Sequence, residues 1–428
     1  MAYYQGLLAE RVGGDYRSAL EELRKAANLA ERVGIIKFLW QAEQVRARLL
    51  QDLGRSEEAL ELFGRLRSLP RPENNTPCDE GTLLTNLGWS LLLAREGGAE
   101  AEDPTPILQE AQAIFDENTC ARPDQRLNAR LNLAFAHQQA ARWPEARRSL
   151  QQARPLETHA DLRQRLWWHD LEGRGAIAEG RPEHALVLYD ELEEMAERAL
   201  SPEGRFRAFL GRARARIALG RPEEALAALA EADRSIDEQS WQIPVHEGRD
   251  TFVAQREEAT RLYLELLLAE ERREQAFALA RRARSRLLQQ LAVRDRLARL
   301  TPEEQRKWDG ALSAYLTLRA EIDQQAAQEW HLPQDQRKRA RESRASQLAR
   351  AQEDLDRAVA GLGAPEGSEE RRLSPPGPGE VILAYHPLPR GWVGFAAHEG
   401  GVEVNRFELP VPLPADPAAL SQKLLAPF

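Results

Sequence analysis

The sequence predicts a mostly α-helical protein, an α-α superhelical solenoid of stacked helix pairs, followed by helices and a short β-meander. Three observations lead to this prediction. Charged residues make up 30% of the chain and aromatic residues 6%, as is typical of soluble helical proteins. One phrase of about ten residues recurs at a spacing near forty residues, which is the mark of a repeat architecture. The stretch from 379 to 409 instead contains three short runs with the pattern of strands.

The recurring phrase begins at a predicted tight turn and contains a small residue five positions later. It reads GDYRSALEEL from Gly14, GRSEEALELF from Gly54 and GRPEHALVLY from Gly180. Its small residue recurs at Ala19, Ala59, Ala146, Ala185, Ala225 and Ala276. A further unit, with a loop insertion between its helices, is predicted from LLTNLGWSLLLAREGG and DPTPILQEAQAIF, so the chain contains about seven units.

Each unit is predicted to be two antiparallel helices. Glycine in the turn tolerates a left-handed backbone, and the dipeptides Pro182-Glu183 and Pro222-Glu223 suit the first turn of the second helix. The recurring alanine is expected where two helices cross closely, because a larger side chain would hold them apart. One pair cannot bury its apolar face alone, so the units are expected to stack.

These features resemble the tetratricopeptide repeat (TPR) family. The turn glycines and the alanine series carry the resemblance, together with Gly88-Trp89, Gly173 and Tyr189. It covers roughly residues 2 to 290, and the units are longer than the 34 residues usual in the family. The resemblance implies a TPR-like solenoid over residues 1–290, whose concave surface is lined by the first helix of each unit and binds a protein or peptide.

Equivalent positions of the first helices are expected to form a row on that concave surface. The position eleven residues before each recurring alanine, or its equivalent, holds Arg48, Trp89, Phe135, Arg174, Arg214 and Glu265. Guanidinium groups make bidentate contacts with carboxylates and stack on rings, so the row suits an acidic or aromatic peptide. Ion pairs with glutamates of the same chain are the competing explanation for these arginines.

Residues 291–362 are predicted to be an antiparallel helical hairpin, and residues 363–379 a linker rich in proline and glycine. The segment from Thr301 to Glu304 has the capping-box pattern of a helix start. Apolar residues follow at mostly helical spacing: Trp308, Leu312, Tyr315 and Ile322 in the first helix, then Leu348, Leu355, Val359 and Leu362 in the second.

Residues 380–428 are predicted to begin another domain. Val381–Tyr385, Trp392–His398 and Val402–Leu409 are expected strands, the last two joined as a hairpin, and a helix is expected from Asp416. Three strands and one helix cannot bury a core of their own, and the outer strands would leave unpaired edges. The segment is therefore interpreted as the first part of a larger α/β domain.

The order of closing repeat, helical spacer, GEVILAY strand and hairpin from Trp392 resembles TPR proteins that carry a CHAT domain. CHAT domains are caspase-like, related to separase, and act as cysteine endopeptidases with a His–Cys dyad that follows this opening hairpin. The resemblance implies a regulatory region of a TPR–CHAT protease in bacterial defence or programmed cell death, with a protein partner or a larger defence complex bound to the repeats. The chain ends before the dyad, so no catalytic residue is assigned and no peptidase activity is expected from these residues.

Two alternatives remain at this point: a non-enzymatic TPR scaffold or transcription-regulatory protein, and nucleic-acid binding through the arginine-rich helices. The net charge of -9 argues against the second. No metal-ligand spacing, cofactor motif or apolar run of membrane-spanning length occurs, so no metal, cofactor or membrane contact is predicted. Cys78 and Cys120 are predicted to be unpaired loop thiols in a cytoplasmic protein.

Overall fold

The computed structural model describes most of the chain. The described residues are 16–52, 55–73, 75–96, 101–117, 122–199, 201–241, 252–253, 256–297, 300–328, 376–388 and 390–408, with isolated positions between 333 and 350. The chain forms two compact units. The first consists of residues 1–121, 242–251 and 290–367, and the second of residues 122–241, 252–289 and 368–428.

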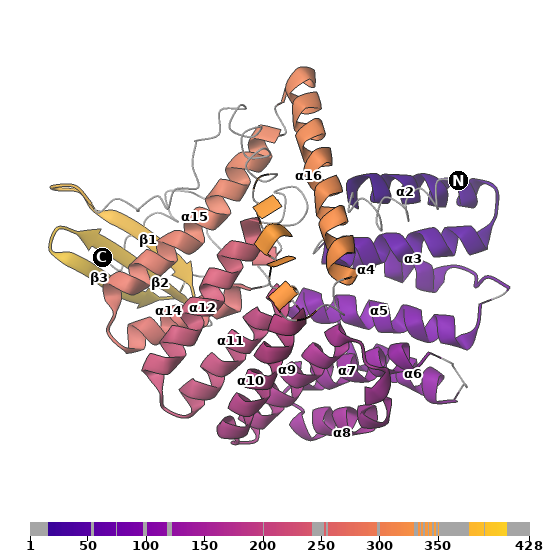
Figure 1. Cartoon of the computed structure of the whole chain (residues 1–428), viewed down its shortest axis with the longest axis horizontal. Coiled ribbons are helices and arrows are strands. Elements are labelled where there is room, and N and C mark those ends of the chain that lie inside the picture. Colours follow the sequence, from indigo (N-terminus) through magenta and orange to yellow (C-terminus); the bar gives the residue numbers. More distant parts are fainter. Residues whose placement is uncertain are drawn as a thin grey trace. The chain divides into compact units, whose positions relative to one another are not determined.

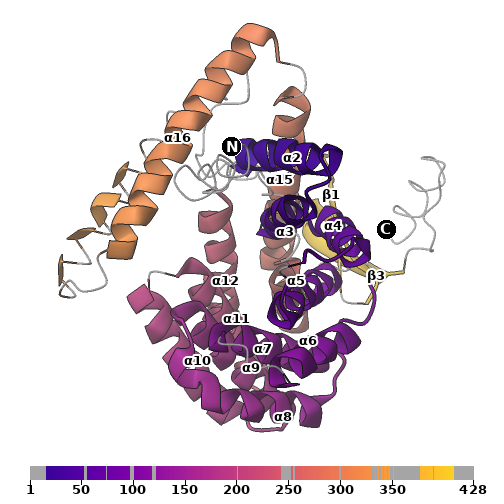
Figure 2. The ribbon, with the colours of Figure 1, turned by 90° about the vertical axis from the view of Figure 1, so that its right-hand side faces the viewer.

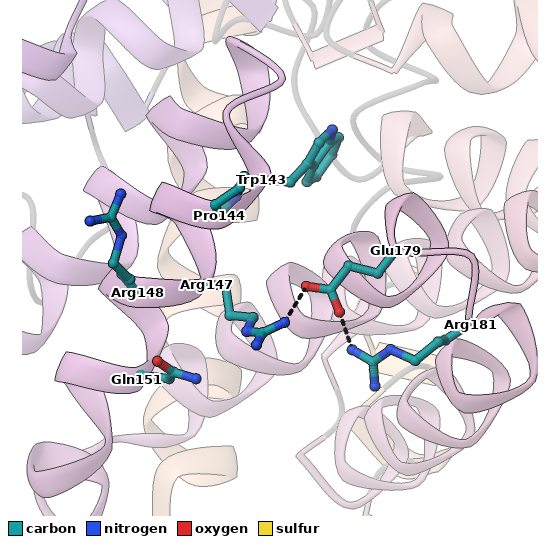
Figure 3. A pocket seen from close by; sticks show the side chains of 7 residues that line it. All are labelled: Trp143, Pro144, Arg147, Arg148, Gln151, Glu179 and Arg181. Atoms are coloured by element: carbon teal, nitrogen blue, oxygen red, sulfur yellow. Dashed lines mark hydrogen bonds and ion pairs between the residues drawn. The ribbon is translucent and has the colours of Figure 1, made fainter.

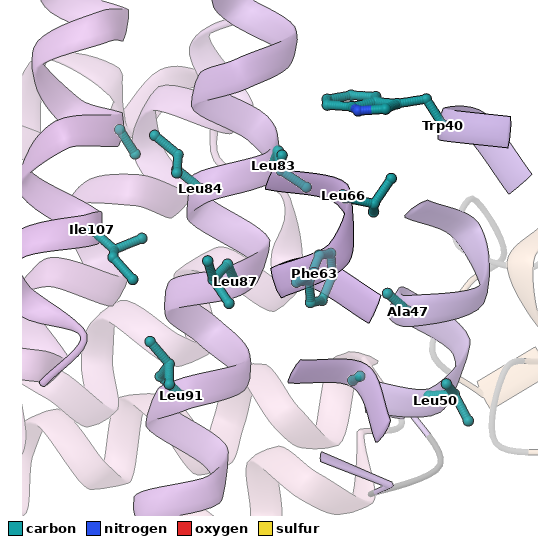
Figure 4. Packing of buried hydrophobic residues seen from close by; sticks show 12 residues of the cluster. Trp40, Ala47, Leu50, Phe63, Leu66, Leu83, Leu84, Leu87, Leu91 and Ile107 are labelled. Carbon is teal, nitrogen blue, oxygen red and sulfur yellow. The ribbon is translucent and has the colours of Figure 1, made fainter. Parts of the chain in front are cut away.

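The first unit contains consecutive antiparallel helices. These are α2 (Tyr16–Arg32), α3 (Ile36–Asp52), α4 (Ser56–Ser68), α5 (Pro77–Glu96) and α6 (Thr105–Glu117). Each helix packs against the next, as Figure 2 shows for α2 to α5. Side chains of α3 to α6 form one core, in which Trp40, Phe63 and Leu83 are buried (Figure 4).

The second unit contains the remaining helix pairs. The first two pairs are α7 (Pro123–Gln139) with α8 (Trp143–Ala153), which is followed by the 3₁₀ helix η2 (Arg154–His159), and α9 (Leu162–Ala178) with α10 (Pro182–Ala199). The next two are α11 (Pro202–Ala218) with α12 (Pro222–Trp241), and α14 (Glu257–Ala269) with α15 (Arg273–Leu297), of which the second unit includes residues up to 289. Five of the recurring alanines lie on the second helix of a pair, and Ala19 lies on α2; all six are at most 2% exposed. Ala111 takes the same place in α6, the second helix of the pair with the insertion. The predicted TPR-like arrangement of helix pairs is therefore confirmed.

The turn between the helices of a pair has the same backbone with and without glycine. Gly180 and Gly220 have φ values of 73° and 69°. Ala141 and Glu271 stand at the equivalent positions with φ values of 54° and 56°, although such values cost energy for residues with a Cβ atom. In each turn the next backbone N–H reaches back to the end of the helix, as from Arg181 to the carbonyl of Ala176 at 2.8 Å. This hydrogen bond is the pattern of a Schellman motif.

Tyr189 of α10 fills the space between α9 and α11. Its side chain is fully buried, and its hydroxyl lies 3.5 Å from the carbonyl oxygen of Asp170. A Cβ atom added at Gly173 of α9 would lie 2.6 Å from the ring, and one added at Gly211 of α11 would lie 2.1 Å from it. Both helices therefore need glycine where they face Tyr189. Burial raises the pKa of the Tyr189 hydroxyl well above its ordinary value.

The helical spacer is described over its first helix, α16 (Pro302–Gln328). The predicted capping box is present: the Thr301 N–H donates to the Glu304 carboxylate at 2.8 Å, and the Glu304 N–H donates to the Thr301 hydroxyl at 3.4 Å. Trp308, Leu312 and Tyr315 are buried. The side chain of Ile322 and the predicted residues Leu348, Leu355, Val359 and Leu362 lie outside the described residues. Since α15 continues to Leu297, seven residues past 290, the boundary there stays a prediction.

Cys78 lies in the first turn of α5 and is disulfide-bonded. The prediction of an unpaired loop thiol is therefore wrong for Cys78, and Cys120 lies outside the described residues. A disulfide requires two cysteines that meet in the fold, which their spacing along the chain does not reveal. In the described part of the chain, no helix is long and apolar enough to cross a bilayer.

The C-terminal strands form a small antiparallel sheet, which confirms the predicted β-meander. The strands β1 (Ile382–Pro387), β2 (Trp392–His398) and β3 (Gly401–Phe407) lie in the order β1-β2-β3. Ala384 of β1 pairs with Phe395 of β2, which pairs with Val404 of β3. The predicted helix from Asp416 lies outside the described residues.

One face of the sheet shares a hydrophobic core with the closing repeat. Figure 1 shows the strands beside α14 and α15. Val393, Phe395 and Ala397 of β2 pack into one cluster with apolar residues of α12, α14 and α15. The ring centroids of Phe395 and Phe277 are 6.0 Å apart. The sequence predicted a sheet without a core of its own, and the structure shows that the repeats supply that core.

The sheet is expected to lose stability in mild acid because of His386. This β1 residue is buried, and burial lowers the pKa of its imidazole below the ordinary 6.5. The hydrogen bond to the Pro387 carbonyl and the charge of Glu257 oppose this shift, whereas Arg261 and Arg284 add to it. As the pH falls below 6.5, the unfolded state takes up the proton first, so folding free energy is lost. Amide protection factors of β1 and β2, measured by hydrogen exchange, should be lower at a pH of about 5.5 than at about 7.5. The variant His386→Gln should remove this difference, and protection that does not fall in acid in the wild type would contradict the assignment.

Candidate protein-interaction surface

The first helices of the second unit carry a connected set of arginines, carboxylates and aromatic rings. We call this set the first-helix cluster; its members are Phe135 of α7, Trp167, Asp170 and Arg174 of α9, Glu203, Arg207 and Arg214 of α11, Arg256 immediately before α14, and Glu258 of α14. Ion pairs and ring contacts join seven members to one another: Phe135, Trp167, Asp170, Arg174, Glu203, Arg207 and Arg256. The ion pair between Arg214 and Glu258 is linked to them through charge, because Arg174 acts on the Glu258 carboxyl. The cluster therefore contains side chains from the first helices of four consecutive helix pairs.

Asp170 is the most buried charged group of the cluster. Its side chain is 2% exposed, and its Oδ2 accepts a hydrogen bond from Arg174 Nε at 3.0 Å and from Arg207 Nη1 at 3.2 Å. Arg174 lies one turn further along α9, whereas Arg207 comes from α11. One carboxylate thus holds two guanidinium groups from different repeats, which is the arrangement that makes a buried charge tolerable.

Aromatic rings lie against the same guanidinium groups. The Arg207 guanidinium carbon is 4.6 Å from the ring centroid of Trp167, and that of Arg174 is 5.2 Å from the centroid of Phe135. The two rings contact each other edge to face, with centroids 4.9 Å apart. Cation–π contacts of this kind orient the guanidinium plane. The rings and Asp170 together fix both arginines in place before any partner arrives.

Glu203 extends the cluster toward α14. It accepts a hydrogen bond from Arg207 Nε at 2.7 Å and pairs with Arg256, whose guanidinium carbon lies 3.6 Å from the ring centroid of Phe252. Burial alone would raise the pKa of the Glu203 carboxyl, but the charges of Arg256 and Arg207 outweigh it and hold that pKa well below its ordinary value. Glu203 is therefore ionised at neutral pH.

Arg214 and Glu258 connect α11 to α14 by an ion pair. The charge of Arg214, with a smaller effect from Arg174, lowers the pKa of the Glu258 carboxyl. The carboxylates of the cluster differ in accessibility: the side chain of Asp170 is 2% exposed, that of Glu203 39% and that of Glu258 62%. The half-buried Glu203 and the exposed Glu258 are thus more accessible to exchange with carboxylates of another molecule than Asp170 is.

The structure brings together part of the predicted row. Phe135 and Arg174 are in contact, and Arg214 belongs to the same cluster. Glu265 lies half-buried on α14, while Arg48 is exposed on α3 and Trp89 half-buried on α5 in the first unit. The competing explanation also applies, because Arg174 and Arg214 have the carboxylates of Asp170 and Glu258 as partners. A single row over all six residues stays a prediction.

Several cluster members were not singled out from the sequence as site residues. They are Trp167, Asp170, Glu203, Arg207, Arg256 and Glu258. The pairs Asp170–Arg174 and Glu203–Arg207 are acid and base four residues apart on one helix, a spacing that indicates an ion pair from sequence alone. The bonds between helices gave no such signal, because they join residues 37 to 53 positions apart.

No protein-family model matches the chain, and no curated protein matches it. Two solved structures are similar to part of it. Both show nearly identical TPR-like repeats of a protein provisionally called a kinesin light chain from Podosopora anserina, one of them as a single-substitution variant. Each is 20% identical and covers 46% of this chain and 95% of the other, with TM-scores of 0.35 and 0.34. The TPR-like class therefore rests on the helix pairs, buried alanines and turns of this chain itself.

Proposed function

We propose that the repeats bind a segment of a partner protein at the first-helix cluster. The observation that carries this proposal is a set of arginines that lie close to aromatic rings and are bonded to carboxylates of unequal exposure. An acidic side chain of the partner would exchange with Glu203 or Glu258, so that each guanidinium keeps a carboxylate partner. Aromatic side chains of the partner would add to the existing ring contacts.

The arrangement favours such an exchange for two physical reasons. The arginines are already ordered, so binding loses little side-chain entropy there. When a carboxylate of the partner replaces a carboxylate of this chain, the arginine still has an ion pair of the same kind. No buried guanidinium therefore loses its counter-charge. Asp170 stays in place because its side chain is almost fully buried. The surface therefore suits a peptide that combines acidic and aromatic residues.

A broader part of the proposal concerns a longer protein. There the repeats would control a caspase-like CHAT cysteine endopeptidase that begins at about residue 380, in bacterial defence or programmed cell death. The resemblance of the repeat, spacer and hairpin order supports this, and so does the position of α14. That helix carries Glu258 of the cluster and also Leu264 and Leu267, which pack against the sheet. Sequencing the source gene beyond the codon for Phe428 tests this part, since a gene without a downstream His–Cys pair excludes the protease.

Alanine at Arg207 or Arg214, the partners of Glu203 and Glu258, is expected to weaken peptide binding about tenfold. The probes are fluorescent synthetic peptides of alternating acidic and aromatic residues, and matched peptides with lysine in place of each acidic residue. Anisotropy should show binding of the acidic set only, and affinity should fall with added salt. The control is Arg234→Ala, because Arg234 lies on the second helix α12, where it pairs with Glu231. Equal binding of both peptide sets, or unchanged affinity in folded Arg207→Ala and Arg214→Ala variants, would reject the site.

A further inference from the structure

A pocket on another part of the second unit shares no residue with the first-helix cluster. Its volume is about 590 Å³, and it is lined by Trp143, Pro144, Arg147, Arg148 and Gln151 of α8 together with Glu179 and Arg181 of the turn between α9 and α10 (Figure 3). The size lies within the range of small-molecule sites. The pocket is therefore a candidate for a ligand separate from the partner protein.

The sequence of α8 departs from the repeat where it lines this pocket. Arg147 directly follows the recurring Ala146, and its side chain is 63% exposed. In the other units the equivalent position holds Leu20, Leu60, Leu186, Leu226 and Phe277, which pack in the hydrophobic clusters, and Gln112 in the unit with the insertion. Trp143 likewise stands where Pro182 and Pro222 begin the next two second helices. Departures from a local pattern are expected where a protein has a functional site.

The pocket carries an excess of positive charge. Three arginines line it, and Glu179 is the one carboxylate among the lining residues. Arg148 already pairs with Glu145 of its own helix at 3.0 Å, so Arg147 and Arg181 carry the charge that faces Glu179. Figure 3 shows Glu179 between two of them: it accepts hydrogen bonds from Arg181 and, at 3.4 Å, from Arg147. The bond from Arg181 and the further bond from Arg147 lower the pKa of the Glu179 carboxyl. Glu179 thus stands where an anionic ligand group would bind, and it orients two guanidinium groups from neighbouring repeats.

We propose that this pocket binds a nucleoside phosphate. The phosphate oxygens replace the Glu179 carboxylate on Arg147 and Arg181, because arginine binds phosphate in the bidentate geometry that a carboxylate also accepts. The base stacks on the indole of Trp143 beside Pro144. The Gln151 amide supplies both a donor and an acceptor for the edge of the base. The proposal does not depend on partner binding at the first-helix cluster.

The test is isothermal titration calorimetry of the full chain with ATP, GTP, CTP and UTP, and with tripolyphosphate as the phosphate part alone. At least one nucleotide is expected to bind with a Kd on the order of 100 µM. Arg147→Leu introduces the residue that other units carry there and should weaken that binding about tenfold. Trp143→Leu should reduce the nucleotide affinity to that of tripolyphosphate, because only the ring contact is removed.

The matched control is Arg234→Leu, which removes an equally exposed arginine of α12 and should bind the nucleotide as the wild type does. Circular dichroism melting of each variant checks that it is folded. Three results overturn the proposal: no heat with any of the four nucleotides, equal affinity for tripolyphosphate and nucleotide in the wild type, or an equal loss in Arg234→Leu. The second result would show that the pocket binds polyanions without recognising the base. The third would show that the loss of affinity is a general effect of charge.

Discussion

Alanine at Gly211 is expected to lower the free energy of unfolding of the second unit by about 3 kcal/mol. The added methyl group would lie 2.1 Å from the ring of Tyr189, which is fully buried between α9 and α11. A ring enclosed on both sides cannot move aside, so the two helices must separate. The measurement is urea unfolding of the full chain, with hydrogen exchange of the α10 and α11 amides to localise the loss.

The control for Gly211 is Gly64→Ala in α4. A Cβ atom at Gly64 meets no atom within 4 Å, so this change should stabilise its helix by about 0.5 to 1 kcal/mol. A second check is the double variant Gly211→Ala with Tyr189→Leu, in which the smaller side chain makes room for the methyl group. It should be more stable than the sum of the two single effects predicts. Additive effects would show that the ring contact does not limit the packing of α11.

Asparagine at Asp170 is expected to lower the free energy of unfolding by about 3 kcal/mol. The substitution keeps the shape of the side chain and removes the negative charge shared by Arg174 and Arg207. Both guanidinium groups would then lie close together around a buried neutral amide, without their common counter-charge. Thermal unfolding and hydrogen exchange of α9 and α11 measure the effect.

The matched control for Asp170 is Asp190→Asn on α10. Asp190 also accepts a hydrogen bond from an arginine, Arg212 Nε at 2.7 Å, but its side chain is largely exposed. Exposed ion pairs contribute less than about 1 kcal/mol, so this variant should unfold almost as the wild type does. If Asp170→Asn is equally mild, the cluster is held by its ring contacts and other bonds rather than by the buried carboxylate.

The helix pairs could be predicted because their signals are local. A small residue that recurs every forty residues identifies the crossing point of each pair, and Ala185 and Ala225 are indeed fully buried. The turn signal was equally local, since Gly180 and Gly220 adopt the left-handed backbone that their position requires. The same backbone at Ala141 and Glu271 shows that the helix ends impose the turn even where glycine is absent.

The candidate site could be predicted only in part. Equivalent positions of the first helices indicated Phe135, Arg174 and Arg214, and the structure places these three in one cluster. The partners that define the chemistry of the cluster, above all Asp170, were missed. A carboxylate shared between α9 and α11 depends on the distance and rotation of two helices, and neither quantity is encoded in the spacing along one helix.

The sequence by itself determined the helix pairs, their turns, the capped start of α16 and the β-meander, because each depends on residues a few positions apart. The tertiary structure decided which carboxylate pairs with which arginine, that Tyr189 is enclosed by two glycines, and that the sheet takes its core from the closing repeat. These features join helices and strands that lie far apart along the chain. Their energies come from close packing and from the burial of charge, which arise only when the helices and strands meet.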